Sequence, residues 1–277
     1  MRHRKIYTYN LGYNIMDITW MHAIVLICSG LVVGFINTLA GGGTIISLSV
    51  FMFFGLPPVI ANGTNRVAVL LQNITAVTNF ARHKLIPWTR TYRLSVPIVA
   101  GACAGAWFAG VMSNTVFHYL FAAVAVLFAT LLLTRPERWL KERADLLAQP
   151  SRPLHYLLMF GIGIYCGVIH VGAGYMILAL LVLGTGYELL KANAIKNFLV
   201  MVYVPFSLLI FAWQGNVRWD YGLVHAIGNI IGAYIGSRVA LRGGAPIIRY
   251  IMLVLISVVI LQLMGVIQPE TIAKWLK

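Results

Sequence analysis

Residues 37–46 read NTLAGGGTII and place three consecutive glycines, Gly41–Gly43, inside an apolar run. No Asp, Glu, Lys or Arg occurs between Ile18 and Asn65, so the run is long enough for a membrane helix and more. Backbone groups cannot stay unpaired in lipid, and irregular backbone survives there only inside protein or beside a water-filled cavity. The stretch therefore predicts a broken membrane helix with a polar space next to it.

The composition of the whole chain supports this interpretation. The 277 residues are 60% hydrophobic and only 10% charged, with a mean hydropathy of +0.84. Such an apolar chain exceeds what a soluble domain can bury. A spanning helix needs about 20 apolar residues, and further uncharged runs cover 94–134, 153–187, 197–217 and 250–269. We predict an all-α, polytopic transmembrane helical bundle whose surroundings are the lipid bilayer.

The net charge of +14 raises the alternative of nucleic-acid binding. The charges fall mostly between the apolar runs, however, as they do in the positive loops on the cytoplasmic side of membrane proteins. We therefore expect no nucleic-acid partner. The cysteines Cys28, Cys103 and Cys166 lie in apolar runs without metal-ligand spacing, and we expect neither a metal nor a cofactor.

The sequence repeats itself in one constant register without a gap. Gly41 falls on Gly172, Gly43 on Gly174 and Trp88 on Trp219. Glycines and a tryptophan in one register are hard to obtain by chance from apolar composition. We divide the chain accordingly into a basic N-terminal segment, a first transmembrane repeat, a polar linker, a second repeat and a tail, at 1–17, 18–134, 135–153, 154–265 and 266–277.

Each repeat is expected to contain a long helix, a glycine break, a short apolar piece, a loop and three further helices. In the first repeat the helices are expected at 18–40, 44–56, 66–82, 92–112 and 114–134, with a loop at 57–65. In the second they are expected at 154–171, 175–186, 197–213, 220–240 and 246–264, with a loop at 187–196.

The charges of equivalent loops differ between the repeats. Residues 82–93 carry four Lys and Arg side chains, whereas their counterparts 213–224 carry one Arg and one Asp. Residues 107–118 carry none, whereas 238–249 carry three Arg. If Lys and Arg collect on the cytoplasmic side, equivalent loops face opposite sides and the repeats are inverted. The basic N-terminus argues against inversion, because inversion would leave it outside the cytoplasm.

The breaks are candidates for an anion site. The short piece after each break exposes free N–H groups and a partial positive charge at its start, and paired glycine-interrupted segments are the best sequence pointer to a transporter site. The alternative is close packing between helices, which we favour for the pairs Gly101/Gly105 and Gly232/Gly236. The candidate substrate-binding residues at the breaks are Asn37, Gly41, Gly42, Gly43, Thr44, His170, Gly172 and Gly174.

A second motif occurs in both repeats, as ANGTNR at 61–66 and ANAIKN at 192–197. Each motif brings one cation together with amide or hydroxyl groups, and a guanidinium fits carboxylate or sulfonate oxygens. The alternative is a pair of interfacial cations. Gln72 and Asn73 could line the path or bond to a neighbouring helix. The motifs contribute the candidates Asn62, Gly63, Thr64, Arg66, Asn193, Lys196 and Asn197.

NTLAGGG, GLPP, ANGTNR and RHKLIPW, in this order, resemble the TauE/SafE family of sulfite exporters and 4-toluene sulfonate uptake proteins. The resemblance covers about 18–265 and implies a multi-pass protein of the bacterial inner membrane with about eight spanning helices. It also implies small anionic substrates such as sulfite, sulfoacetate or other organosulfur compounds. Gly41–Gly43, Asn62, Gly63, Thr64 and Arg66 match the family's motif, while HVGAGY and ANAIKN in the second repeat depart from it.

These observations predict a secondary transporter of a small anion that works by alternating access. If transport is coupled to protons, His170 is the candidate titrating group. An anion channel and a membrane scaffold remain alternatives. An enzyme is disfavoured, because no nucleophile is placed beside a base. The sequence is compatible with a homodimer.

Overall fold

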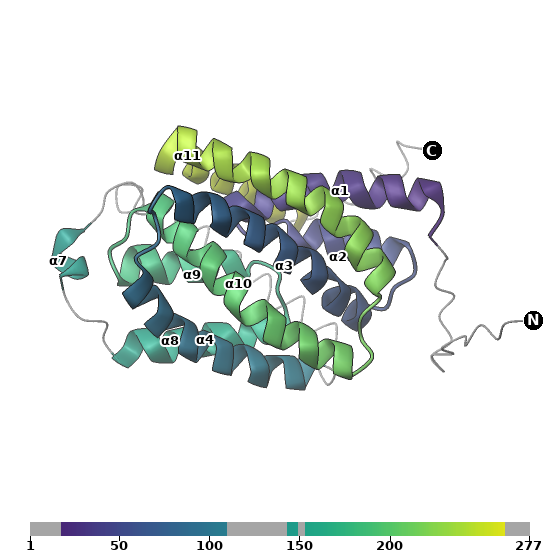
Figure 1. The fold of residues 1–277 in the computed structure, drawn as a ribbon, viewed down its shortest axis with the longest axis horizontal. Helices are drawn as coiled ribbons and strands as arrows, with labels where there is room; N and C mark the ends of the chain where they lie inside the picture. Colours follow the sequence, from purple (N-terminus) through teal and green to yellow (C-terminus); the bar gives the residue numbers. More distant parts are fainter. Residues whose placement is uncertain (1–17, 110–142, 149–152, 264–277) are drawn as a thin grey trace, which may run out of the picture.

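The computed structural model describes residues 18–109, 143–148 and 153–263. Within these ranges every regular element is a helix (Figure 1), which confirms the all-α prediction. The predicted helix at 114–134 and both terminal segments lie outside the described residues. Helix α11 bends sharply at Gly244, where φ is 61°, close to the predicted boundary between 220–240 and 246–264.

The first repeat contains α1 (Trp20–Leu39), α2 (Thr44–Phe53), α3 (Pro58–Arg82) and α4 (Trp88–Phe108). The short helix α7 (Ala144–Leu147) lies in the linker. The second repeat contains α8 (Pro153–Val168), α9 (Ala173–Ala179), the π-helical turn η2 (Leu180–Gly184), α10 (Leu189–Trp213) and α11 (Trp219–Leu263).

The two repeats follow the same backbone path. In the register that pairs Gly41 with Gly172, the first residue of α10 falls on that of α3, and the first residue of α11 falls on that of α4. Left-handed backbone recurs in the same register, which requires glycine or strain in both copies. The three pairs with positive φ are Gly41 and Gly172, Gly55 and Gly186, and Lys84 and Gly215.

The predicted loops at 57–65 and 187–196 are wrong over most of their length. The ANGTNR motif lies within the first turns of α3, and ANAIKN lies within the first turns of α10. Pro58 occupies the first turn of α3, where its fixed φ and missing N–H favour a helix start. The polar motif residues are buried between helices instead of being exposed in a loop.

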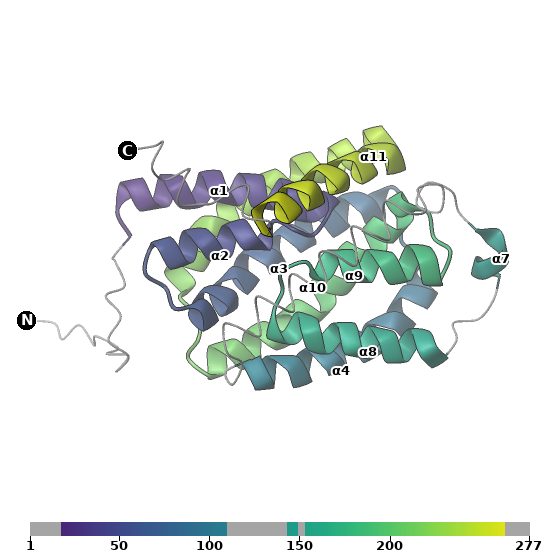
Figure 2. The same ribbon diagram turned by 180° about the vertical axis from the view of Figure 1, so that it is seen from behind.

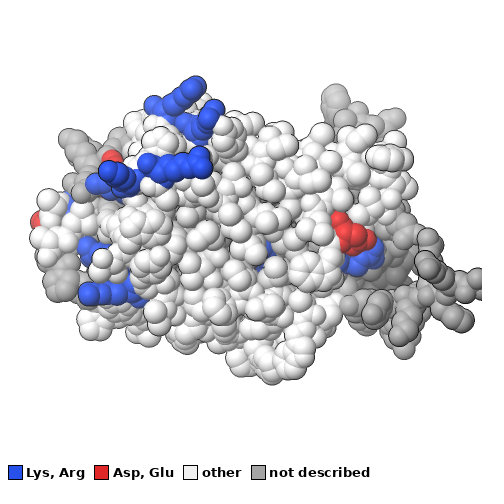
Figure 3. Space-filling model, viewed as in Figure 1, with Lys and Arg blue, Asp and Glu red and all other residues white. Residues whose placement is uncertain are grey.

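The two helices that carry the motifs, α3 and α10, run in opposite directions (Figure 1). Helices α3 and α10 cross the middle of the bundle side by side and antiparallel, and the α3–α4 and α10–α11 connections lie at opposite ends of the molecule (Figures 1 and 2). Lys and Arg side chains gather at the end where α3 meets α4 and α11 bends (Figure 3). The face shown between the two ends is almost free of charge.

The outer helices are exchanged between the repeats. Helix α1 packs along α11, and α4 packs along α8. A Cβ added to Gly232 would overlap the carbonyl oxygen of Leu31, and one added to Gly105 would overlap that of Ile164. The predicted small-residue packing of the Gly101/Gly105 and Gly232/Gly236 pairs is therefore confirmed.

Helices α1 and α10 are each long and apolar enough to cross a membrane, with mean hydropathies of 2.0 and 1.9 over their best windows. Large apolar side chains on the outside of the bundle are exposed, including Trp20 at 89% and Phe53 at 80%. Exposed apolar surface of this extent suits lipid more than water.

Candidate functional site

The two interruptions of the helices meet at the centre of the molecule. Helix α1 ends at Leu39 and α2 begins at Thr44, while α8 ends at Val168 and α9 begins at Ala173. A Cβ added to Gly41 would lie 2.6 Å from the Cα of Gly174, and the reverse addition gives 2.7 Å. Only glycines allow the two backbones to approach so closely.

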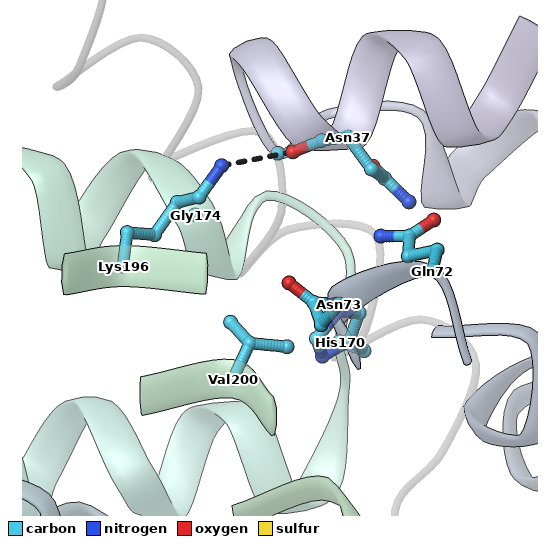
Figure 4. A pocket seen from close by; sticks show the side chains of 8 residues that line it. Asn37, Gln72, Asn73, His170, Gly174, Lys196 and Val200 are labelled. Carbon is cyan, nitrogen blue, oxygen red and sulfur yellow. Dashed lines mark hydrogen bonds between the residues drawn. The ribbon is translucent and has the colours of Figure 1, made fainter. Parts of the chain in front are cut away.

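A small cavity lies beside this contact (Figure 4), and its interior volume of about 10 Å³ is about enough for one water molecule. Five of its lining residues belong to the predicted site. The remaining three come from the interiors of α3 and α10. The full lining is Asn37, Gly41, Gln72, Asn73, His170, Gly174, Lys196 and Val200.

Lys196 is the cation at this cavity, and its side chain is only 1% exposed. Its Nζ donates hydrogen bonds to the backbone oxygens of Asn37, at 2.8 Å, and Thr38, at 3.2 Å (Figure 4). These carbonyls belong to the last turn of α1, where no intrahelical donor is left for them. Lys196 forms no ion pair with a carboxylate of the described residues.

Arg66 makes the equivalent hydrogen bonds to helix-end carbonyls at the other break, but it does not line the cavity. Its Nη2 donates to the backbone oxygens of Gly167, at 2.6 Å, and Cys166, at 3.1 Å, in the last turn of α8. Its Nη1 donates to Ser207 Oγ at 2.8 Å, and its guanidinium lies 4.6 Å from the ring centroid of Phe211. Arg66 is fully buried and all its described contacts are internal.

The amides of the two motifs complete this arrangement. Asn62 Nδ2 donates to the backbone oxygen of Val168 at 2.8 Å, and Asn197 Nδ2 donates to that of Thr38 at 3.2 Å. The ANGTNR motif of the first repeat thus satisfies the end of α8 in the second, and the ANAIKN motif satisfies the end of α1 in the first. Each motif holds the interrupted helix of the other repeat.

Asn37 holds the first break together from within. Its Oδ1 accepts the N–H of Gly43 at 2.7 Å, and its Nδ2 donates to Thr44 Oγ1 at 3.4 Å. The Gly43 N–H, predicted to receive substrate, is therefore bonded inside the protein. Thr44 lies behind Asn37 and not among the lining residues.

The other predicted residues do not line the cavity. A Cβ on Gly42 would overlap the hydroxyl of Tyr175, and one on Gly63 would overlap the carbonyl of Asn216. Thr64 Oγ1 accepts the N–H of Arg218 at 2.9 Å. The other two form local structure: Gly172 takes a left-handed φ of 70° before α9, and Asn193 Oδ1 accepts from Asn197 at 3.4 Å.

His170 lines the cavity, and its Nδ1 lies 2.8 Å from the hydroxyl oxygen of Tyr203. In the register of the repeats, Tyr203 occupies the position in the second repeat that Gln72 occupies in the first. Gln72 Oε1 is buried and has no hydrogen-bond partner among the described residues. Buried polar atoms without partners are rare and point to a missing water or ligand.

Sequence reasoning left Gln72 and Asn73 outside the candidate site. Both are amides within an apolar run, where they are costly unless they are used. That signal pointed to them, but only the packing of α3 against α10 shows that they face the cavity. Asn73 Nδ2 also bonds to the Val69 carbonyl one turn earlier, at 2.7 Å.

The fold and the site define a class of protein. A helical bundle with an apolar outside, two interrupted helices in contact and a buried polar cavity is typical of membrane transporters. No group of three or more His, Cys, Asp or Glu side chains lies together in the described part of the chain.

Residues 26–263 match the sequence pattern of the family described as "Sulfite exporter TauE/SafE", and the chain belongs to this family. The resemblance noted from the motifs is thereby confirmed. The chain is a membrane transporter, as its family and the names of its relatives indicate.

Three relatives carry the description "probable membrane transporter protein". ORF9 of Sinorhizobium sp is 29% identical over 241 residues, covering 84% of this chain and 88% of its own. YfcA of Escherichia coli K12 is 26% identical over 255 residues, covering 91% and 93%. A Haemophilus influenzae protein is 25% identical over 240 residues, covering 84% and 91%. No solved structure matches the chain.

Proposed function

We propose that the protein is a secondary transporter of a small sulfur oxyanion or organosulfonate, such as sulfite or sulfoacetate, across the bacterial inner membrane. It is built from two inverted repeats whose glycine-broken helices meet within the bilayer. The anion binds at the small cavity between the two breaks, which must widen to hold it, and access to the cavity alternates between the two sides of the membrane. The partners of the protein in this proposal are the anion and the surrounding lipid.

The observation that carries the proposal is the buried amine of Lys196 at this cavity, which has no carboxylate partner among the described residues. An ammonium has three N–H donors, and the described contacts of Lys196 use two of them. In this proposal the third N–H is donated to the anion in the cavity. Burial strengthens this attraction, because fewer water molecules screen the charge. The family description, which names sulfite exporters, supports the same substrate class.

The neighbouring groups suit an oxyanion. Asn37, Gln72 and Asn73 bring amides to the same space (Figure 4), and their N–H groups can bind sulfite or sulfonate oxygens. His170 is the proposed titrating group if transport is coupled to protons. The small size of the cavity favours a carrier over an open channel.

Transport into proteoliposomes tests the proposal. We expect wild-type protein to exchange labelled sulfite or sulfoacetate for the same unlabelled anion, and Lys196→Met to lose at least about 90% of this activity, because a charge-assisted hydrogen bond contributes about 1.5–3 kcal/mol. Lys191→Ala, which removes a lysine from the first turns of the same helix, is the control and should retain exchange.

The outcome separates the alternatives. Counterflow, in which internal unlabelled anion drives uptake of labelled anion, identifies a carrier, since a channel cannot produce it. Normal exchange by Lys196→Met would remove the proposed role of this residue. Absence of transport and of anion-induced thermal stabilisation for sulfite, sulfate, sulfoacetate and taurine would contradict the substrate class.

A further inference from the structure

We propose that the ammonium of Lys196 is a built-in substitute for an alkali cation. In this inference the oxygens at the C-terminal end of α1 form a latent monovalent-cation site, which the lysine side chain fills permanently. The wild-type protein would therefore need no sodium or potassium ion at this position. The proposal goes beyond the proposed function, because it concerns a cation and not the transported anion.

The first support is the set of oxygens around the ammonium. The carbonyl oxygens of Asn37 and Thr38 lie 2.8 and 3.2 Å from Nζ. The end of a helix carries a partial negative charge, and both carbonyls belong to the last turn of α1. In transporters with discontinuous helices, such helix ends and unwound carbonyls are the groups that coordinate Na⁺.

The second support is two buried side-chain oxygens without partners among the described residues, one on Thr38 and one on the neighbouring Asn197. Thr38 Oγ1 and Asn197 Oδ1 are buried without a hydrogen-bond partner in the described structure. Asn197 is held next to the site, since its Nδ2 bonds to the Thr38 carbonyl at 3.2 Å. Backbone, hydroxyl and amide oxygens are hard ligands, which suit alkali cations.

The absence of charge on the described contacting groups favours a monovalent ion over a divalent one. Divalent calcium and magnesium are normally bound with one or more carboxylates. Lys196 has no carboxylate partner within the described residues, and the groups that contact it are all neutral. A single positive charge is what these neutral oxygens can stabilise.

The break between α8 and α9 differs from the one between α1 and α2, and the difference explains why only the end of α1 should accept a free alkali ion. At the end of α8, the Arg66 guanidinium divides its donors between two carbonyls and Ser207 and lies over the Phe211 ring. A spherical ion cannot reproduce this planar, forked contact. The flexible lysine at the end of α1 makes only point contacts to two oxygens, which a small ion can reproduce.

Two neutral variants test the proposal, Lys196→Ala and Lys196→Ser. Each is purified and thermally unfolded in sodium, potassium or N-methylglucamine chloride at equal ionic strength, without any substrate anion. We expect the Tm of at least one variant to rise saturably in sodium or potassium chloride, by about 2 °C or more over N-methylglucamine. The wild type, Lys196→Arg and Lys191→Ala should show no difference between these salts.

A further variant tests whether the added ion binds beside Thr38. Adding Thr38→Val to the responsive variant removes Oγ1 and keeps the shape of the side chain, so it should weaken the response to the ion at least threefold in concentration. The proposal is overturned if both neutral variants unfold at the same temperature in all three salts. It is equally overturned if neither variant can be purified folded in any of them, because a cation then does not replace the ammonium. Neither result depends on which anion the protein transports.

Discussion

The two interrupted helices are held in the same way but with different consequences. At the end of α1 a lysine bonds to two carbonyls and also lines the cavity. At the end of α8 an arginine bonds to two carbonyls, Ser207 and the face of Phe211, away from the cavity. The comparison shows two equivalent helix caps, of which one is enclosed by protein contacts and the other also lines the cavity.

Position in the sequence explains part of this difference. The lysine aligns with Asn65 of the first repeat, and Arg66 aligns with Asn197 of the second. The two cations are therefore one residue out of register, which on a helix corresponds to a rotation of about 100°. Each cation still reaches the opposite helix end, but they meet different surroundings there.

The largest expected effect comes from removing the structural cap. Arg66→Ala leaves the Cys166 and Gly167 carbonyls buried without their donor, and each such group costs about 1–3 kcal/mol. We expect a loss of about 3–5 kcal/mol and little folded protein, measured as the monodisperse fraction and Tm in detergent. Arg82→Ala, at the exposed end of the same helix, is the control. Folded, stable Arg66→Ala protein would remove the distinction between the two caps.

The second-largest loss of stability is expected from changes at the contact between Gly41 and Gly174. Gly41→Ala combines a left-handed φ of 88° with a clash against Gly174, whereas Gly174→Ala meets the same contact without a left-handed φ. The backbone penalty is about 1–2 kcal/mol and the overpacking costs about 1–3 kcal/mol. We expect Gly41→Ala to lower the free energy of unfolding by about 2–4 kcal/mol and Gly174→Ala by less. Equal losses in the two variants would show that the clash alone, and not the left-handed backbone of Gly41, lowers the stability.

The smallest effect on stability is expected at the cavity wall. Gln72→Leu removes a buried amide oxygen that has no partner among the described residues, so the Tm should stay within about 2 °C of wild type or rise. The affinity for sulfite should nevertheless fall by about tenfold, measured by anion-dependent thermal shift. Tyr203→Phe changes the equivalent position of the second repeat and tests whether the two sides of the cavity contribute equally. Unchanged affinity in Gln72→Leu would place the anion elsewhere.

The helical class, the register of the repeats and the positions of most helices follow from the sequence alone. Uncharged runs and glycines are local signals, and the pairing of Trp88 with Trp219 carries through to the first residues of α4 and α11. The motif loops were predicted wrongly, because polar residues were assumed to lie outside helices. Pro58, a favoured helix-starting residue, was the local signal to the contrary.

The candidate site was harder to predict, for a physical reason. Asn37, His170 and Lys196 were predicted as site residues, and all three line the cavity. The bonding partners of the cations were not predictable, because the carbonyls that they reach lie far away along the chain, in the other repeat. Such contacts depend on how the repeats pack, and no local pattern encodes that.

The exchange of outer helices makes the stability of each repeat depend on the other. Because α1 lies on α11 and α4 lies on α8, a single repeat would leave the glycine-rich faces of both its outer helices uncovered. Each repeat therefore buries its outer helices only against the other repeat, and a half-length chain would need a second copy to cover the same faces.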